Sequence, residues 1–290
     1  MRVLFYVNRS RESGFGHYYR SIALADEASR RGHTIAFVGD TDPFCRYYQV
    51  DLGDKAAFNK AVADFNPDWL VIDLPGDVPS YMAEIRAKLC VVDGVGHNSD
   101  IRPDLAISQG FEGDRCAPEY LILRRTLERY KAEPGTRWFV FGGAADEIGL
   151  LPAFYRVMAD YKANLLVTEL MRYNWLTYSS NSGPNHWGIT SQDDSVLGWL
   201  AMAQRVALHQ GVMAWESFYY QIPAYIFSRS QHHLDAALEM ERRGYCLAYP
   251  SIGLPPDAML REFLLREFVP TGERPDLEGA ARVIKLIEQS

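Results

Sequence analysis

Short apolar runs alternate with helical stretches along the first part of the chain. The runs lie at 3–7, 35–38, 69–72, 89–92, 105–107 and 120–123. Between several of them, apolar residues at helical spacing predict helices at 20–30, 55–64 and 79–88. An alternation of strands and helices predicts a parallel sheet that is covered on both faces.

The alternation stops at 124–137 and then begins again. This stretch, RRTLERYKAEPGTR, is polar and charged and contains Pro134-Gly135, so we interpret it as a linker. A second set of apolar runs follows at 138–141, 165–167, 187–189, 206–208, 224–227 and 246–248, with helices expected at 151–161, 194–203, 212–220 and 234–243. An amphipathic helix is expected at 276–288. The pattern predicts two domains, 1–130 and 131–290.

Two such sets predict an α/β fold of the GT-B type, in which two Rossmann-like parallel-sheet domains face a cleft. Ligands of such folds bind at the carboxyl ends of the strands. A fold does not by itself define a function, so the functional prediction depends on the motifs at these strand ends.

Composition narrows the class of protein. The 290 residues are 48% hydrophobic and carry a formal charge of −7, which does not favour nucleic acid as a partner, although a local patch of Arg11, Arg20 and Arg124-Arg125 could meet an anionic acceptor. No apolar run approaches the roughly 20 residues of a membrane span. The four cysteines form no C-x-x-C pair, which disfavours a zinc knuckle and fits reduced thiols in a cytoplasmic protein.

The first candidate motif is SGFGHYYR at 13–20, between the first strand and a helix. Gly14 and Gly16 would let the backbone approach a ligand, and a helix N-terminus offers free N–H groups. Neutral imidazole at such a turn is what a general base needs, so His17 is the candidate catalytic residue. The local sequence also fits a helix cap made by Ser13 and the glycines.

The second motif, FGGAADE at 141–147, follows the first strand of the second set. The turn at Gly142 and Gly143 can hold a phosphate or diphosphate on backbone amides. An ordinary strand-to-helix turn explains the same residues equally well.

The third motif is HQGVMAWESFYYQIPAYIFSRSQHH at 209–233. His209 and Gly211 end a strand, and Glu216 lies among apolar neighbours in the next helix, where a carboxylate could accept both hydroxyls of a ribose. Pairing of Glu216 with an arginine, or capping of a backbone group, is the alternative. His232 and His233 are adjacent, so on a helix they point about 100° apart and do not predict a shared metal.

Taken together, these motifs resemble a known family nearly from end to end. The chain is similar to the UDP-sugar hydrolases of pseudaminic acid biosynthesis, which belong to the GT-B glycosyltransferase superfamily. GFGHYYR matches the G-x-G-H-x-x-R opening of that family, and PEYLILRR at 118–125 resembles its P-x-Y-x-x-L-R pattern. FGGAAD, GVMAWESFYYQIP and LEGAARVI stand where the family has its GG-S/T-D loop, its glycine–glutamate–proline segment and its closing helix.

The resemblance implies a role for each motif. His17 would activate water to attack the anomeric carbon of a UDP-sugar, and Glu216 would hold the ribose. Amides of the Gly142-Gly143 turn and of the helix after Gly211 would hold the leaving diphosphate, so no metal and no cofactor is expected. The substrate-binding residues expected on this basis are Gly14, Gly16, Arg20, Asp73, Gly142, Gly143, His209, Gly211, Glu216, His232 and His233.

The chain also departs from the family at several positions. The D-H-Y-G pattern after the third strand is here Asp73-Leu74-Pro75-Gly76, and the paired aspartates after the next strand are Asp93-Gly94. His232-His233 replaces an Asn-Gln pair that contacts the donor in many GT-B proteins. The departures imply a different sugar or a different acceptor.

The leading hypothesis from the sequence is a nucleotide-sugar hydrolase, with a UDP-sugar as its partner. Its first alternative is an inverting glycosyltransferase with an unknown acceptor, which would use the same base. The second alternative is an inactive nucleotide-sugar-binding protein.

Overall fold

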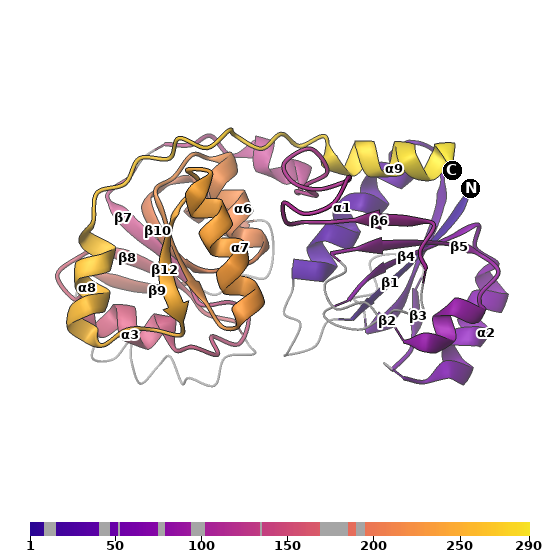
Figure 1. Cartoon of the computed structure of the whole chain (residues 1–290), viewed down its shortest axis with the longest axis horizontal. Coiled ribbons are helices and arrows are strands. Elements are labelled where there is room, and N and C mark those ends of the chain that lie inside the picture. Colours follow the sequence, from indigo (N-terminus) through magenta and orange to yellow (C-terminus); the bar gives the residue numbers. More distant parts are fainter. Residues whose placement is uncertain are drawn as a thin grey trace. The chain divides into compact units, whose positions relative to one another are not determined.

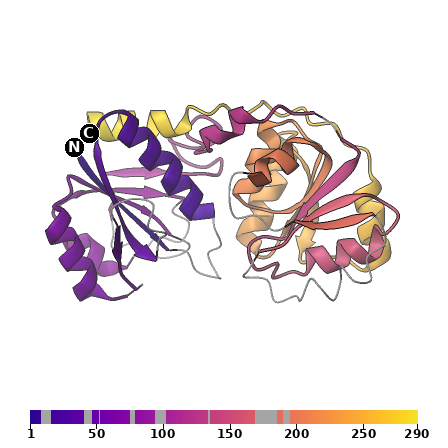
Figure 2. The same cartoon turned by 180° about the vertical axis from the view of Figure 1, so that it is seen from behind.

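The computed structural model describes residues 1–8, 16–40, 47–51, 53–74, 79–93, 102–133, 135–168, 185–189 and 195–290. The chain divides into two compact units. The first unit consists of Met1–Arg125 with Asp276–Ser290, and the second of Thr126–Pro275. Within the described residues each unit contains one six-stranded sheet with only parallel pairs, as the apolar pattern predicts (Figures 1 and 2).

The sheet of the first unit has the order β3-β2-β1-β4-β5-β6. Its strands are β1 (Arg2–Asn8), β2 (Thr34–Asp40), β3 (Tyr47–Gln49), β4 (Trp69–Asp73), β5 (Lys88–Val92) and β6 (Leu105–Ile107). Its helices are α1 (Gly16–Arg30), α2 (Lys55–Phe65) and α9 (Gly279–Gln289), with a 3₁₀ turn η1 (Ser80–Glu84). The strand order reverses between β1 and β4, which is the position where open parallel sheets bind ligands.

Both faces of this sheet are buried, which explains why its strands are continuously apolar. In β1, Val3, Phe5 and Val7 contact the core that includes α1 and α9. Leu4 and Tyr6 belong to the core on the other face, which includes α2. Because successive side chains of a strand point to opposite faces, an apolar run without alternation indicates a sheet with two covers.

The last helix, α9, belongs to the first unit, whereas the predicted boundary assigned 131–290 to the second domain. Its Val283, Ile284 and Ile287 are buried in the core beside α1. Gly279 lies so close to the carbonyl of Leu121 that a Cβ atom there would lie 1.9 Å from this oxygen. The apolar stripe of α9 therefore completes the first core, although its sequence position follows the second unit (Figure 1).

The sheet of the second unit has the order β12-β11-β10-β7-β8-β9, which reverses between β7 and β10. Its strands are β7 (Arg137–Phe141), β8 (Ala163–Leu166), β9 (His186–Ile189), β10 (Ala203–His209), β11 (Ala224–Ser228) and β12 (Leu247–Ile252). Its helices are α3 (Leu150–Val157), α5 (Ser195–Ala201), α6 (Val212–Tyr219), α7 (Gln231–Arg242) and α8 (Asp257–Leu265). A 3₁₀ turn, η2 (Arg125–Arg129), begins at the unit boundary, and α3 and α8 share the core on one face of the sheet.

Two expected elements differ from the structure. The run at 120–123 is not a strand, although Leu121, Ile122 and Leu123 are buried. The side-chain amide of Gln109 donates to the Tyr120 carbonyl and accepts from the Ile122 N–H, in place of a neighbouring strand. The expected helix at 79–88 is only the short η1, since the chain becomes extended at Ile85 and enters β5 at Lys88. Helix α8 is an addition to the prediction.

A span of membrane would need a long apolar helix. Among the described residues, no helix has that length and apolarity.

Candidate active site

His17 and Asp73 meet at the point where the strand order of the first sheet reverses. His17 lies in the first turn of α1, and Asp73 is the last residue of β4, paired with Val7 at the end of β1. The Nδ1 atom of His17 is 2.5 Å from Oδ1 of Asp73. Asp73 is fully buried, whereas the His17 side chain keeps 15% of its exposure. A buried carboxylate thus orients an imidazole that still reaches the surface.

Arg20 holds the same carboxylate from the next turn of α1. Its Nε donates to Oδ2 of Asp73 at 3.0 Å, and its Nη2 donates to Oδ1 at 2.6 Å. Residues three apart on a helix share a face, so His17 and Arg20 both point toward β4. Burial lowers the pKa of the Arg20 guanidinium, but Asp73 and Asp93 outweigh it and raise that pKa above its ordinary value. Arg20 is therefore a permanent buried cation.

The tautomer of His17 follows from these contacts. Its Nδ1 also lies 2.7 Å from Nη2 of Arg20, so Nδ1 faces both an acceptor and a donor. A bare lone pair on Nδ1 would be repelled by the Asp73 oxygen at 2.5 Å, so we assign the proton to Nδ1 and the bond to Asp73. The lone pair of neutral His17 is then on Nε2, which is the arrangement of a general base.

Asp93 is a member of this cluster that the sequence analysis did not include among the site residues. It follows β5 directly, and its Oδ2 accepts from Nη1 of Arg20 at 2.6 Å. Its backbone has a φ of +57°, a conformation that non-glycine residues rarely adopt. The available signal was positional, because Asp93 ends its apolar strand in the same way that Asp73 ends β4.

Of the two glycines predicted to bind substrate in the first unit, the structure describes one. Gly16 is the first residue of α1 and so lies beside His17. Gly14 lies outside the described residues. So do Pro75 and Gly76, which belong to the stretch where the sequence differs from the family's D-H-Y-G pattern.

In the second unit, Gly142 and Gly143 follow β7 at the corresponding reversal of strand order. A Cβ atom on Gly142 would lie 1.7 Å from Oδ1 of Asp146, so any other residue here would have to displace this carboxylate. Asp146 accepts the N–H groups of Leu150 at 2.8 Å and Leu151 at 3.0 Å. The first turn of α3 is thereby capped by a carboxylate of this chain, and those two amides are unavailable to a phosphate. Burial raises the pKa of Asp146 to about 6, against the lowering effect of the two amides.

His209 lies beside this turn. Leu208 pairs with Phe141, so the next residues, His209 and Gly142, leave the sheet side by side. A Cβ atom on Gly143, whose φ is +84°, would lie 3.7 Å from the His209 ring. The Nε2 atom of His209 is buried and has no hydrogen-bond partner among the described residues. Burial, followed by the nearby His233 and Arg229, lowers the pKa of His209 to about 3.

His233 extends this group from the first turn of α7. Its ring centroid is 5.1 Å from that of His209 and 5.6 Å from that of His232. Its Nδ1 lies 2.6 Å from Oγ of Ser230, the N-cap of α7. His232 is exposed. The structure thus brings together four of the predicted residues, Gly142, Gly143, His209 and His233, at the ends of β7 and β10 and in the first turn of α7.

Helix α6 begins immediately after His209 and Gln210. Its N-cap is Gly211, so no side chain caps the first turn. The φ of Gly211 is 166°, an extended value open to any residue, and a Cβ atom there would meet nothing within 4 Å. Neither sterics nor backbone conformation therefore requires glycine. Glu216, on the same helix, is 1% exposed.

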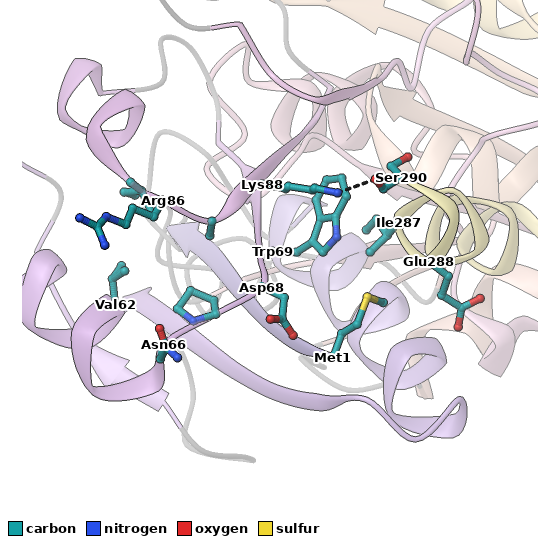
Figure 3. A pocket seen from close by; sticks show the side chains of 13 residues that line it. Met1, Val62, Asn66, Asp68, Trp69, Arg86, Lys88, Ile287, Glu288 and Ser290 are labelled. Atoms are coloured by element: carbon teal, nitrogen blue, oxygen red, sulfur yellow. Dashed lines mark hydrogen bonds between the residues drawn. The ribbon is translucent and has the colours of Figure 1, made fainter.

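Among the described residues, no group of three or more His, Cys, Asp or Glu side chains is placed to hold a metal ion. A hollow of about 630 Å³ lies at the other end of the first sheet, beside Asp68, Trp69, Lys88 and Ser290 (Figure 3). Trp69 and Lys88 begin β4 and β5, so this hollow is at the amino ends of the strands, away from His17.

Comparisons with known proteins identify the fold. No family model and no curated protein sequence matches the chain. The solved glycotransferase of kitacinnamycin superimposes with a TM-score of 0.67 and 14% identity, covering 99% of this chain and 98% of that chain. The UDP-GlcNAc 2-epimerase of Methanocaldococcus jannaschii, in complex with UDP-GlcNAc and UDP, has a TM-score of 0.66 and 8% identity, with full coverage of both. MurG from Acinetobacter baumannii has a TM-score of 0.64 and 10% identity, covering 100% and 99%.

The chain therefore has the GT-B fold, as the sequence predicts. Identities this low establish the fold alone. Membership of the UDP-sugar hydrolase family stays a prediction, and the activity depends on the chemistry of the site.

Proposed function

We propose that this protein is a glycosyltransferase that moves a sugar from a nucleoside diphosphate to a hydroxyl group, with His17 as the base. The observation that carries the proposal is the 2.5 Å contact between His17 Nδ1 and the buried Asp73. A carboxylate held in this way fixes the imidazole tautomer and stabilises the imidazolium that forms during proton transfer.

The reaction follows from that arrangement. Nε2 of His17 removes the proton of the acceptor hydroxyl as its oxygen attacks the anomeric carbon. The bond from that carbon to the β-phosphate oxygen breaks, and its electron pair leaves with the nucleoside diphosphate. Attack opposite the leaving group inverts the anomeric centre. Arg20 holds Asp73 in place throughout, since it donates to both carboxylate oxygens within the same buried cluster.

The second unit would hold the donor. His209 and Gly143 line the strand ends, and the uncapped first turn of α6 offers N–H groups to the diphosphate. The orphaned Nε2 of His209 is supporting evidence, because buried polar atoms usually have a partner and a phosphate oxygen would supply one. We assign the ribose to Glu216, as the motif suggests.

The choice of a transferase over the hydrolase of the leading sequence hypothesis has two supports. Of the three similar structures described above, two are a glycotransferase and MurG, and the third is an epimerase in complex with UDP-GlcNAc and UDP. The departures from the hydrolase family also lie at the sugar and acceptor positions, while the base motif is retained. UDP is the donor nucleotide that we test first.

The decisive experiment measures nucleotide release from UDP-, dTDP-, GDP- and CMP-sugars, with and without a small-molecule extract as a source of acceptors. We expect release that requires the extract and is lost in His17→Ala. Release without any acceptor, also lost in His17→Ala, would identify the hydrolase instead. Binding without turnover in both conditions would support the inactive nucleotide-sugar-binding protein instead. Nucleotide release that persists in His17→Ala would show that His17 is not the base.

A further inference from the structure

The second unit concentrates imidazoles at the reversal of its strand order. The ring centroids of His209 and His233 are 5.1 Å apart, and those of His233 and His232 are 5.6 Å apart. The three residues come from two elements, the end of β10 and the first turn of α7. These titratable groups lie beside the turn at Gly143, where the proposed function places the diphosphate.

Charged groups lie on several elements near the His209–His233 pair. Arg229, after β11, lies near His209 and is paired with Glu147 at 2.8 Å. Asp146 caps α3 from the β7 loop. Glu216 is buried in α6, which contacts β10. The two carboxylates on the β7 loop are each engaged, Asp146 by amides and Glu147 by Arg229.

We propose that the His209–His233 pair takes up one proton when a nucleoside diphosphate binds, and that the resulting imidazolium holds the leaving diphosphate. This inference rests on the proposed function of the second unit. It adds a proton to the donor complex, shared within the pair and drawn from solvent, with no bond formed other than N–H.

The pair would take up a proton because a bound diphosphate reverses the sign of the nearby charge. Without a ligand, burial, the neighbouring imidazole and Arg229 all disfavour a charge on His209. A diphosphate brings at least two negative charges. At about 4 Å and an effective dielectric constant of about 20, each would raise the pKa of an imidazole by about 3. Two interacting imidazoles titrate as a unit, so the proton belongs to the pair.

The consequence concerns the breaking bond. A cation that exists only in the ligand complex faces the oxygen on which negative charge develops as the anomeric bond breaks. When the nucleoside diphosphate departs, the pair returns its proton and becomes neutral, which weakens its hold on the product.

Isothermal titration calorimetry tests the inference with the full-length chain. UDP and UDP-glucose are titrated in several buffers of different ionisation enthalpy, from about pH 6.5 to about pH 8.5. The slope of the observed enthalpy against buffer enthalpy reports the protons exchanged. We expect uptake that rises toward one proton, with affinity improving by up to about tenfold for each pH unit of acidification. UDP-glucose excludes a contribution from a terminal phosphate.

Variants locate the proton. His209→Asn and His233→Asn should each remove most of the uptake, and the second keeps the test valid where the buried first one fails to fold. His186→Gln is the matched control, since His186 is a buried histidine of the same unit at the amino end of β9 with a pKa also lowered by burial. It should keep full uptake, and Asp146→Asn should do the same.

Two failures are distinguishable. Nucleotide binding without proton uptake, or uptake that both histidine variants retain, overturns this inference and leaves the proposed function intact. Binding of none of the nucleotides overturns both, because the second unit then has no donor site.

Discussion

His17 Nδ1 and Asp73 Oδ1 lie 2.5 Å apart although 56 residues separate them in the chain. Helix α1 presents the imidazole and β4 ends at the carboxylate, so the reversal of strand order brings the two together. The carboxylate is fully buried and the imidazole is not, which is the asymmetry expected of an orienting acid and a reacting base.

Replacement of Asp73 tests this relationship directly. In Asp73→Asn an amide N–H can face Nδ1, which then accepts it and leaves the proton on Nε2, so the base is lost. We expect the turnover rate to fall by about 10³-fold or more. Asp68→Asn, at the amino end of the same strand, is the control and should retain activity within about twofold. An active Asp73→Asn enzyme would contradict the assigned tautomer.

Arg20 is predicted to be essential for the stability of the first unit. Arg20→Met leaves Asp73 and Asp93 without their shared cation, which should cost about 3–5 kcal/mol of the free energy of unfolding. Arg30→Met is the matched control on the same helix, because Arg30 is 58% exposed and its pair with Glu27 is worth about 1 kcal/mol or less. Urea denaturation measures both. An equal decrease in the free energy of unfolding in the two variants would show that the buried network stabilises the unit no more than a surface ion pair does.

Gly211 provides a test of the donor site that leaves the fold intact. An alanine there meets no atom within 4 Å, so the cost to folding is about 1 kcal/mol at most, from the weaker N-cap. We expect the dissociation constant for UDP to rise about tenfold or more, because the methyl group occupies space beside the α6 amides. Gly110→Ala, whose added Cβ would make only an ordinary contact at 3.6 Å, is the control. Unchanged affinity in Gly211→Ala would place the diphosphate elsewhere.

Asp146 predicts a pH dependence of stability with a definite sign. Its pKa is raised from 3.8 to about 6, so the folded state binds this proton more tightly than the unfolded chain. The resulting stabilisation is fully present below about pH 4 and is lost as the pH rises through about 6, a change of about 3 kcal/mol. Relative to Asp146→Asn, the wild type should therefore gain stability on acidification. Chemical denaturation of both proteins across this range measures the difference.

Asp160→Asn supplies the opposite control. The bond from Arg261 lowers the pKa of Asp160, so the wild type should gain stability over that variant as the pH rises. The same sign in both comparisons would mean that general acid denaturation, and not burial of Asp146, dominates.

The local elements were largely predictable because their signals are local. Apolar runs mark eleven of the described strands, and only the three-residue β3 was not predicted. The helix predicted at 20–30 begins earlier, at Gly16, so the structure and not the sequence pattern places His17 and Arg20 on one helix face. The glycines at 142 and 143 also marked a turn after a strand. The failure at 120–123 shows the limit of this approach, since burial makes a run apolar whether a strand or the Gln109 side chain satisfies its backbone.

The sequence by itself determined two parallel sheets and a short set of polar residues at their strand ends. Only the tertiary structure decided which of these residues touch. Asp93 joins Arg20 across 73 residues, His209 meets Gly143 and His233, and α9 completes the core of the first unit. The physical reason is that hydrophobic burial is non-directional: an apolar stripe specifies that a helix must be covered, while the partner that covers it is selected by the packing of the whole chain.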